Sequence, residues 1–143
     1  MTAVHFESYS GARTHLKDLL DAAAEGRSAT IRRDDQRVAV VGAERLRGVL
    51  SRSVPTPVAV SENDGWSLYL PGLPVAADGA TFDAAVSELI DALREYAEDW
   101  NQRLRLAANH QGNWSLVQLV DLSDADQIRA WITGEDAPQR HAG

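Results

Sequence analysis

A segment with two prolines, residues 51–57, divides this chain into two parts of opposite charge. Pro55 and Pro57 give the segment the composition of a linker. Up to Arg52 the chain has nine basic and seven acidic residues, whereas beyond Arg52 it has five basic and fourteen acidic residues. The net charges are therefore +2 and −9, within a total of −7. This asymmetry indicates that one part binds a polyanion and the other binds a basic partner.

The length of 143 residues is within the range of one domain, but the charge division and the linker favour two small domains. We expect a domain at residues 1–52, a linker at 53–57, a second domain at 58–134 and a disordered tail at 135–143. No apolar run approaches the roughly 18 residues of a membrane span, and the first residues lack the pattern of a signal peptide. The absence of cysteine fits a reducing compartment. We therefore expect a cytoplasmic protein that does not contact a membrane.

The first part has the pattern of a βαββα unit. Alternation predicts a strand at residues 3–7, and leucines and alanines at helical spacing predict a helix over about 9–25, capped by Ser8 or Ser10 and ended by Gly26. Two strands at 29–33 and 37–41 around a turn of residues 34–36, and a short helix at 43–50, complete the unit. A unit of this size buries only about 60% of its unfolded surface, so we expect it to form a homodimer or a higher homo-oligomer.

Three motifs in this part occur in the order typical of one family. An Ala-Arg-x-x-Leu helix start at residues 12–16 precedes an Ile-x-Arg strand at 31–33 and a Val-Ala-Val-Val strand at 38–41. Over about residues 3–50 the chain therefore resembles the Phd/YefM antitoxins. The resemblance implies a homodimer that represses its own operon and neutralises a toxin, commonly a RelE-type ribonuclease or a Doc-like enzyme. The chain departs from the family at the turn, where Gln36 replaces a usual Gly, and at Val38, where the return strand often begins with Pro.

Basic and hydroxyl side chains in this part are candidates for phosphate contacts. Arg13 is expected in the first turns of a helix, whose amide-rich N-terminus favours anions, and Ser10 and Thr14 add hydroxyl donors. Arg32 and Arg33 point to opposite faces of their strand, so at most one of them faces DNA on a given surface. We predict that these five residues bind operator DNA. The alternative is that the arginines only solvate the sheet and pair with nearby acids.

The second part has a different order of elements, with an Asp64-Gly65 hairpin signal between its first two strands. We expect strands at 56–61 and 66–70, an optional strand at 75–77, and a long helix that Thr81 caps and that continues to about Ala108. A strand at 113–122 and a last helix, which Ser123 caps and Gly134 ends, complete the predicted order ββ(β)αβα.

The loops of the second part carry a second, weaker resemblance. Asp64-Gly65-Trp66, the Pro-Gly-Leu-Pro segment at 71–74 and the Asp-Gly-Ala-Thr segment at 78–81 precede an Ala-rich helix. Over about residues 56–122 the chain is similar to HicB antitoxin domains, which implies a partial RNase H-like fold that binds a toxin. Ala84 stands where that family usually has an acid. The whole chain is therefore expected to be α+β, with a Phd/YefM-like module before a small HicB-like α/β domain.

Acidic residues off the apolar stripe of the long helix are candidates for toxin contacts. A toxin that cleaves RNA must hold a polyanion and tends to be basic, so a negative helix face would attract it. Trp131, late in the last helix, is a further candidate for a docking surface. The alternatives are a merely solvated helix face and a core position for Trp131. The predicted toxin-binding residues are Glu88, Asp91, Glu95, Glu98, Asp99 and Trp131.

The RNase H-like topology also raises the possibility of a nuclease, which needs carboxylates that converge on divalent cations. Asp64, Asp78 and Asp83 are candidates, but the pattern does not place them at one strand end. The chain has no Gly-rich phosphate loop, no His-x-x-x-His pair and no serine elbow, and His110 and His141 are isolated. We therefore predict a non-enzymatic antitoxin with no cofactor and no metal. The partners expected are a cognate toxin and operator DNA, and the main alternative is a solitary DNA-binding regulator without a toxin.

Overall fold

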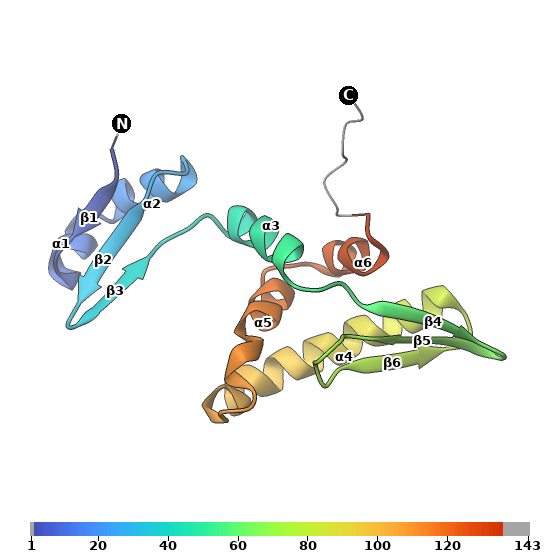
Figure 1. Cartoon of the computed structure of the whole chain (residues 1–143). Helices are drawn as coiled ribbons and strands as arrows, with labels where there is room; N and C mark the ends of the chain where they lie inside the picture. Colours follow the sequence, from blue (N-terminus) through green and yellow to red (C-terminus); the bar gives the residue numbers. More distant parts are fainter. Residues whose placement is uncertain (1, 136–143) are drawn as a thin grey trace. The chain divides into compact units, whose positions relative to one another are not determined.

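The computed structural model describes residues 2–135, and these form two compact units, within residues 1–46 and 47–143 (Figure 1). Each unit contains one three-stranded sheet with helices packed against it. The predicted α+β class is therefore confirmed. The predicted tail at 135–143 lies outside the described residues, except for Glu135.

The first unit is a mixed sheet with two helices between its first two strands. β1 and β2 are parallel, β2 and β3 are antiparallel, and the strand order is β1-β2-β3. The parallel pair requires a crossover connection, which the two helices provide. The elements are β1 (Val4–Phe6), α1 (Tyr9–Thr14), α2 (Leu16–Ala24), β2 (Ala29–Arg33) and β3 (Gln36–Ala39). α3 (Ala43–Ser53) begins in this unit and continues into the second.

Two details of the first unit differ from the sequence prediction. The predicted helix over 9–25 is two helices, because the backbone at His15 (φ −115°, ψ 33°) leaves the helical region. Ser8, and not Ser10, caps α1 by accepting a hydrogen bond from the amide of Gly11 at 3.0 Å. The hairpin turn is Asp34-Asp35, so Gln36 already belongs to β3. Asp34 adopts the positive φ of 55° that such a turn needs, a conformation that Asp tolerates better than most residues.

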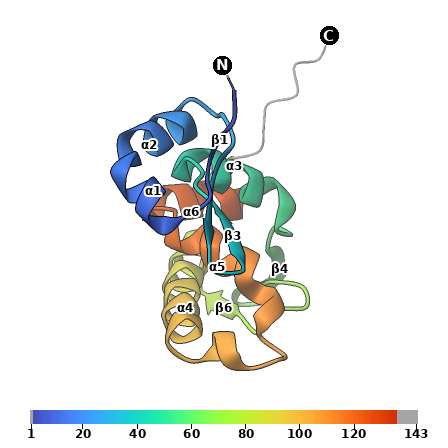
Figure 2. The same ribbon diagram turned by 90° about the vertical axis from the view of Figure 1, so that its left-hand side faces the viewer.

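The core of the first unit is small and lies between α2 and one face of the sheet. Leu19 is its largest fully buried side chain, and Ala22, Ala23 and Ala29 surround it. Figure 2 shows α1 and α2 together beside β1. The opposite face of the sheet carries polar side chains, among them His5 and Thr30, whose Nδ1 and Oγ1 atoms lie 2.7 Å apart. With so little buried apolar volume, this unit depends on further contacts for its stability.

The second unit is an antiparallel sheet followed by three helices. The strand order is β4-β5-β6, and the long helix α4 packs on β5 and β6. Gly79 at the end of β6 permits this packing, because a Cβ atom there would lie 2.3 Å from the amide nitrogen of Ala85. The elements are β4 (Val58–Glu62), β5 (Gly65–Tyr69), β6 (Ala76–Gly79), α4 (Phe82–Gln102), α5 (Trp114–Asp121) and α6 (Ala125–Thr133). Two 3₁₀ turns, Leu104–Leu106 and Gln111–Asn113, connect α4 to α5.

The core of the second unit is large and centres on α4. Thr81 caps this helix as predicted, and the predicted apolar stripe is buried, with Leu89 and Leu93 fully inaccessible. Side chains of β5, α5 and α6 meet the stripe. The indole nitrogen of Trp100 donates to the carbonyl oxygen of His110 at 2.8 Å, which fixes the connection after the helix. The largest fully buried side chains of this unit are Leu68, Leu70, Val86, Leu89, Leu93, Val117, Leu119 and Ile128.

The predicted strand at 113–122 is wrong, because this segment forms α5. Its buried residues, Leu116, Val117, Leu119 and Val120, have helical spacing and pack toward α4. The observed order is thus βββααα instead of ββ(β)αβα, and the HicB-like arrangement is not confirmed. α4 also ends at Gln102 and not near Ala108.

The cap of the last helix was also predicted one residue too early. Asp124 accepts from the amide of Gln127 at 2.8 Å, and the Gln127 side chain accepts from the amide of Asp124, which is a complete capping box. The hydroxyl of Ser123 instead donates to the carbonyl of Leu119 at 2.6 Å. Gly134 ends the helix with φ 82°, as predicted.

Candidate functional site

The polar face of the first sheet holds a cluster around Glu7. His5 Nε2 lies 2.5 Å from Glu7 Oε1, and Arg32 Nε lies 3.5 Å from Glu7 Oε2. The hydrogen bond with His5 lowers the pKa of Glu7 below its ordinary value, and the charges of Arg32 and Arg37 lower it further. Arg37 stands directly opposite Arg32 in the strand register. Arg32, on the middle strand, thus has Glu7 on one side and Arg37 on the other.

Arg37 was missed by the sequence prediction, although a signal for it exists. A two-residue turn at Asp34-Asp35 pairs Arg33 with Gln36 and therefore Arg32 with Arg37. Arg33 points to the other face of the sheet, where its guanidinium carbon lies 5.6 Å from the ring centre of Tyr9. The prediction that Arg32 and Arg33 lie on opposite faces is confirmed.

The three predicted DNA contacts of α1 lie on a helix of only six residues. Arg13 is exposed in its last turn, so the expectation that Arg13 lies at the start of a longer helix is wrong. Thr14 Oγ1 donates to the carbonyl oxygen of Ser10 at 3.0 Å, which joins these two residues to each other. Arg33 is near this helix through Tyr9, whereas Arg32 is on the far side of the sheet. The five predicted residues therefore form two groups, and their role in DNA binding stays a prediction.

The net charge of the first observed unit, residues 1–46, is lower than the net charge of residues 1–52 on which the sequence prediction was based. Residues 1–46 contain seven basic and seven acidic side chains, and the excess of two comes from Arg47 and Arg52 in α3. Any attraction of the first unit for phosphate thus depends on where its arginines lie and not on its net charge.

The predicted acids of α4 form a row along one side of the helix, exposed except for the half-buried Asp99, which we call the acidic row: Glu88, Asp91, Glu95, Glu98 and Asp99. Among the residues that the structure describes, Glu88, Asp91 and Glu95 pair with no basic side chain. Asp99 is half-buried and accepts two hydrogen bonds from Arg103, at 2.7 and 2.9 Å. Glu95, Glu98 and Asp99 also border a hollow between α4 and residues 74–76.

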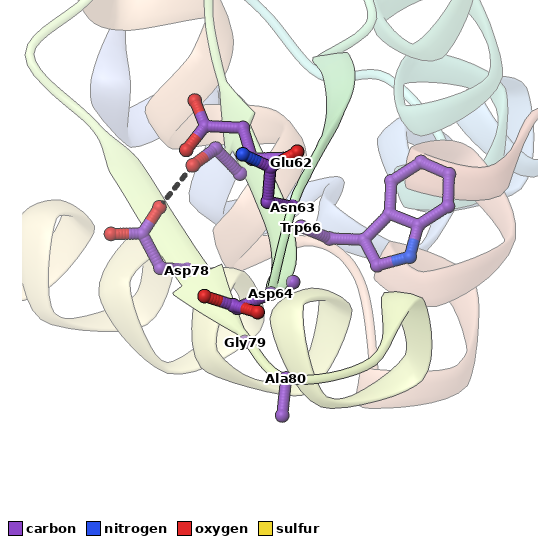
Figure 3. A pocket seen from close by; sticks show the side chains of 9 residues that line it. Glu62, Asn63, Asp64, Trp66, Asp78, Gly79 and Ala80 are labelled. Carbon is purple, nitrogen blue, oxygen red and sulfur yellow. Dashed lines mark hydrogen bonds between the residues drawn. The ribbon is translucent and has the colours of Figure 1, made fainter.

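A second acidic surface lies at the β4–β5 hairpin, in an open hollow that we call the hairpin hollow. Glu62, Asp64 and Asp78 line it together with Ser67, whose hydroxyl donates to Asp78 (Figure 3). Asp64 and Asp78, two of the candidates for a nuclease, thus share one surface. Asp83, the third candidate, instead pairs with Arg129 of α6, at 2.7 Å. Within residues 2–135, no three His, Asp or Glu side chains come together in a group that could hold a metal ion.

Trp131 does not lie on a docking surface. It is 3% exposed, and its indole nitrogen has no hydrogen-bond partner among the described residues. The prediction of a toxin contact at Trp131 is therefore corrected to a core position, since its neighbours at Ile128 and Ile132 are buried with it. No helix in the described part of the chain is both long and apolar enough to cross a membrane.

Comparison with known proteins assigns the chain to a family. Residues 3–134 match the family described as antitoxin of toxin–antitoxin, RelE/RelB, TA system. The chain belongs to this antitoxin family. Its fold is similar to a crystal structure described as the antitoxin part of a candidate toxin/antitoxin system from Syntrophomonas wolfei subsp. wolfei. The TM-score is 0.74 at 15% identity, with 88% of this chain and 94% of the other covered. No curated protein matches the sequence.

As an antitoxin of a toxin–antitoxin system, the chain has a cognate toxin as its partner. The family description fits a regulatory protein. The family that is shown is broader than the Phd/YefM and HicB resemblances, which stay predictions.

Proposed function

We propose that this antitoxin neutralises a ribonuclease toxin of the RelE type through its second unit and represses its own operon through its first. The observation that carries the proposal is the acidic row, which presents Glu88, Asp91 and Glu95 without basic partners among the described residues. Both roles place the antitoxin in the cytoplasm, where the operator DNA is.

The acidic row suits a basic toxin because its charges add over distance. At a rise of about 1.5 Å per residue, the row from Glu88 to Glu98 is about 15 Å long. Each exposed charge contributes little alone, but a field of one sign increases the association rate of an oppositely charged protein. A ribonuclease must bind phosphates, so its RNA site supplies that opposite charge.

The Arg32–Arg37 pair supports the DNA-binding role of the first unit. Like charges directly opposite each other in a sheet destabilise it, and Glu7 is the acid that the structure places beside them. An anion such as a DNA phosphate would relieve the remaining repulsion. Arg33, Arg13, Ser10 and Thr14 remain proposed contacts at the opposite side of the sheet.

Exposed apolar side chains in the first unit support self-association. Leu16 and Leu20 of α2 are 50% and 52% exposed, one helical turn apart, and Val38 of β3 is 49% exposed. We propose that they form the contact of a homodimer, which would supply the apolar burial that the small core lacks. A two-fold dimer would also match the two half-sites of a palindromic operator. Leu16→Glu/Leu20→Glu should then give a monomer in sedimentation experiments.

Co-expression with the product of the adjacent reading frame tests the toxin role. We expect the two proteins to co-purify and the antitoxin to restore growth. Glu88→Gln/Asp91→Asn should lower the association rate constant by about tenfold at low salt and by less at high salt. Asp126→Asn/Glu135→Gln is the control, because it removes two exposed acids elsewhere in the same unit. A protein that binds its operator but no neighbouring gene product would be a solitary regulator, and the proposal would fail.

Binding to the chain's own promoter tests the second role. The logarithm of the binding constant should fall linearly with the logarithm of salt concentration, with a slope set by the phosphates contacted. Arg32→Ala/Arg37→Ala should reduce this slope by about two. Arg105→Ala, in the second unit, should leave it unchanged. Binding that does not depend on salt would contradict the proposed phosphate contacts.

A further inference from the structure

β4 is an edge strand with an open side. The strand order β4-β5-β6 leaves one side of β4 without a neighbour, and all five of its residues, Val58–Glu62, are exposed. Among the described residues, the backbone hydrogen bonds of β4 go to β5 alone. The outer amide and carbonyl groups of β4 are therefore free to pair with another strand.

The helix α4 covers one face of the sheet at β5 and β6 and leaves β4 uncovered. Among the described residues, α4 packs mainly on β6 and to a smaller extent on β5, and no comparable packing on β4 is found. Ala59 and Ser61 point to the same side as Leu68 of β5, which is buried under α4, yet both are exposed. The strand is thus open along its edge and on both of its faces.

β6, at the opposite edge of the same sheet, also has only one strand neighbour, but α4 packs closely on it. The end of β6 lies against the start of α4, where a Cβ on Gly79 would collide with the backbone of Ala85. Proteins usually protect a free edge with a bulge, a proline, a lysine or an inward charge. β4 has none of these within its length, because it pairs residue for residue with β5 and its one charge, Glu62, is at its end.

The chemistry around β4 is apolar at one end and acidic at the other. Val58, Val60 and Tyr69 are 36%, 40% and 43% exposed on the outer face of the sheet. Glu62 and the other acids of the hairpin hollow follow at the hairpin end of the same face (Figure 3). A segment lying along β4 would therefore contact apolar side chains first and carboxylates next.

We propose that β4 receives an extended, basic segment of the toxin as a fourth strand of the second sheet. The inference rests on the proposed function, since the toxin is the basic partner. Main-chain hydrogen bonds would hold the segment, apolar side chains would pack beside Val58 and Val60, and basic side chains would lie near Glu62 and Asp64. A second copy of the chain fits less well. It would bring two units with a net charge of −7 each together, whereas a basic strand offsets the charge.

A charge placed on the edge tests the proposal in the full chain. Val60→Lys should weaken toxin binding by at least about tenfold, because lysine both protects an edge and repels a basic strand. Gln111→Lys is the control: it adds the same charge to an exposed position of the same unit, away from the sheet and the acidic row. We expect Gln111→Lys to change the dissociation constant by less than about threefold. Should Val60→Lys fail to fold by tryptophan fluorescence, Ser61→Lys serves in its place.

A synthetic peptide provides a test that does not need the toxin. The probe is an eight-residue peptide of alternating arginine and valine, and its control is the same peptide with alternate amides N-methylated, which keeps the charge but prevents strand pairing. With the full-length protein, the unmethylated peptide should protect the amides of β4 from hydrogen exchange, and the control should not.

The outcomes separate the inference from the proposed function. If the toxin binds Val60→Lys and Gln111→Lys equally well, the edge is not used and the inference is overturned while the proposed function stands. If Val60→Lys instead halves the mass of the free protein, the edge pairs two copies and the inference is also overturned. If the wild-type chain binds no toxin, the proposed function fails, and so does the inference that rests on it. The peptide result would then report only whether the edge accepts a strand.

Discussion

The two sheets of this antitoxin have three strands each and helices on one face, but they differ in what the helices bury. In the described part of the first unit, Leu19 is the one large side chain that is fully buried beneath the sheet. Beneath the second sheet, leucines, isoleucine and valines from β5, α4, α5 and α6 fill the interior. The first unit therefore has the smaller core, which is the reason to expect a partner surface there, whereas the second has a large core of its own.

The faces that remain open differ as well. The first sheet presents Arg32 and Arg37 side by side with Glu7 next to Arg32, and the second presents Val58, Val60 and the acids of the hairpin hollow. Both units belong to one chain, but their open faces suit opposite partners. Under the proposed function, the roles of this antitoxin are divided between two units, and substitutions can perturb each unit separately.

The largest expected effect comes from a charge placed in either core. Leu19→Asp and Leu93→Asp each bury a carboxylate at a position that is 1% or 0% exposed, which costs several kcal/mol, on the order of a small unit's whole stability. All four tryptophans lie beyond residue 65. Leu93→Asp should therefore shift tryptophan emission to the red, and Leu19→Asp should abolish self-association without that shift. A red shift with Leu19→Asp would show that the units do not fold independently.

A clash at Gly79 should have the next largest effect. Gly79→Ala places a methyl group against the backbone of Ala85, and we expect a loss of about 1–3 kcal/mol or more in the unfolding free energy of the second unit. Gly112→Ala is the control, because nothing lies within 4 Å of its added Cβ. Urea unfolding followed by tryptophan fluorescence measures both. Equal midpoints for the two variants would mean that α4 and β6 are not in close contact.

Removal of a helix cap should have a smaller effect, and the effect should be similar in size in the two units. Ser8→Ala and Thr81→Ala each remove one hydrogen bond to an N-terminal amide, at 3.0 and 3.1 Å, and each should cost about 1 kcal/mol. Because the first unit has less stability to lose, Ser8→Ala should reduce self-association, while Thr81→Ala should lower only the unfolding midpoint of the second unit. The argument from core size would be wrong if Thr81→Ala had the stronger effect on assembly.

The smallest effect concerns pH. The pKa of Glu7 is lowered from its ordinary 4.5, so Glu7 stabilises the folded first unit above that pH and loses this contribution as the pH falls through and below it. The side chain is fully exposed, so the effect is small and falls with salt. Glu7→Gln should flatten the pH dependence of first-unit stability below about pH 5, measured by circular dichroism at low salt. An unchanged pH profile would show that Glu7 does not contribute to the stability of the first unit.

Sequence patterns identified the elements whose local signals agree with their packing. The strand at 29–33, the Gly26 and Gly134 helix ends, the Thr81 cap and the buried stripe of α4 were all predicted. In each case a turn or capping residue and the apolar period point to the same structure. The acidic row was predictable for the same reason, since residues off a helical stripe face solvent.

The failures have physical causes. Residues 113–122 are rich in valine and leucine, and alternation was assigned where a helical period of buried residues was also present. The bend at His15 could not be predicted from the sequence, because no glycine or proline stands at or next to this position. Arg37 and the open edge of β4 depend on strand register and on which strands α4 covers, and both are tertiary properties.

The division of roles between the two units is tested most directly by two matched variants of the full chain. Arg32→Ala/Arg37→Ala should weaken operator binding by at least about tenfold and leave toxin affinity unchanged. Glu88→Gln/Asp91→Asn should slow toxin association by about tenfold and leave operator binding unchanged or slightly stronger. Both activities are measured on the same preparations at the same salt concentration. If the arginine variant lost toxin binding, or if the acidic variant lost operator binding, the two units would not have separate partners and the account would be contradicted.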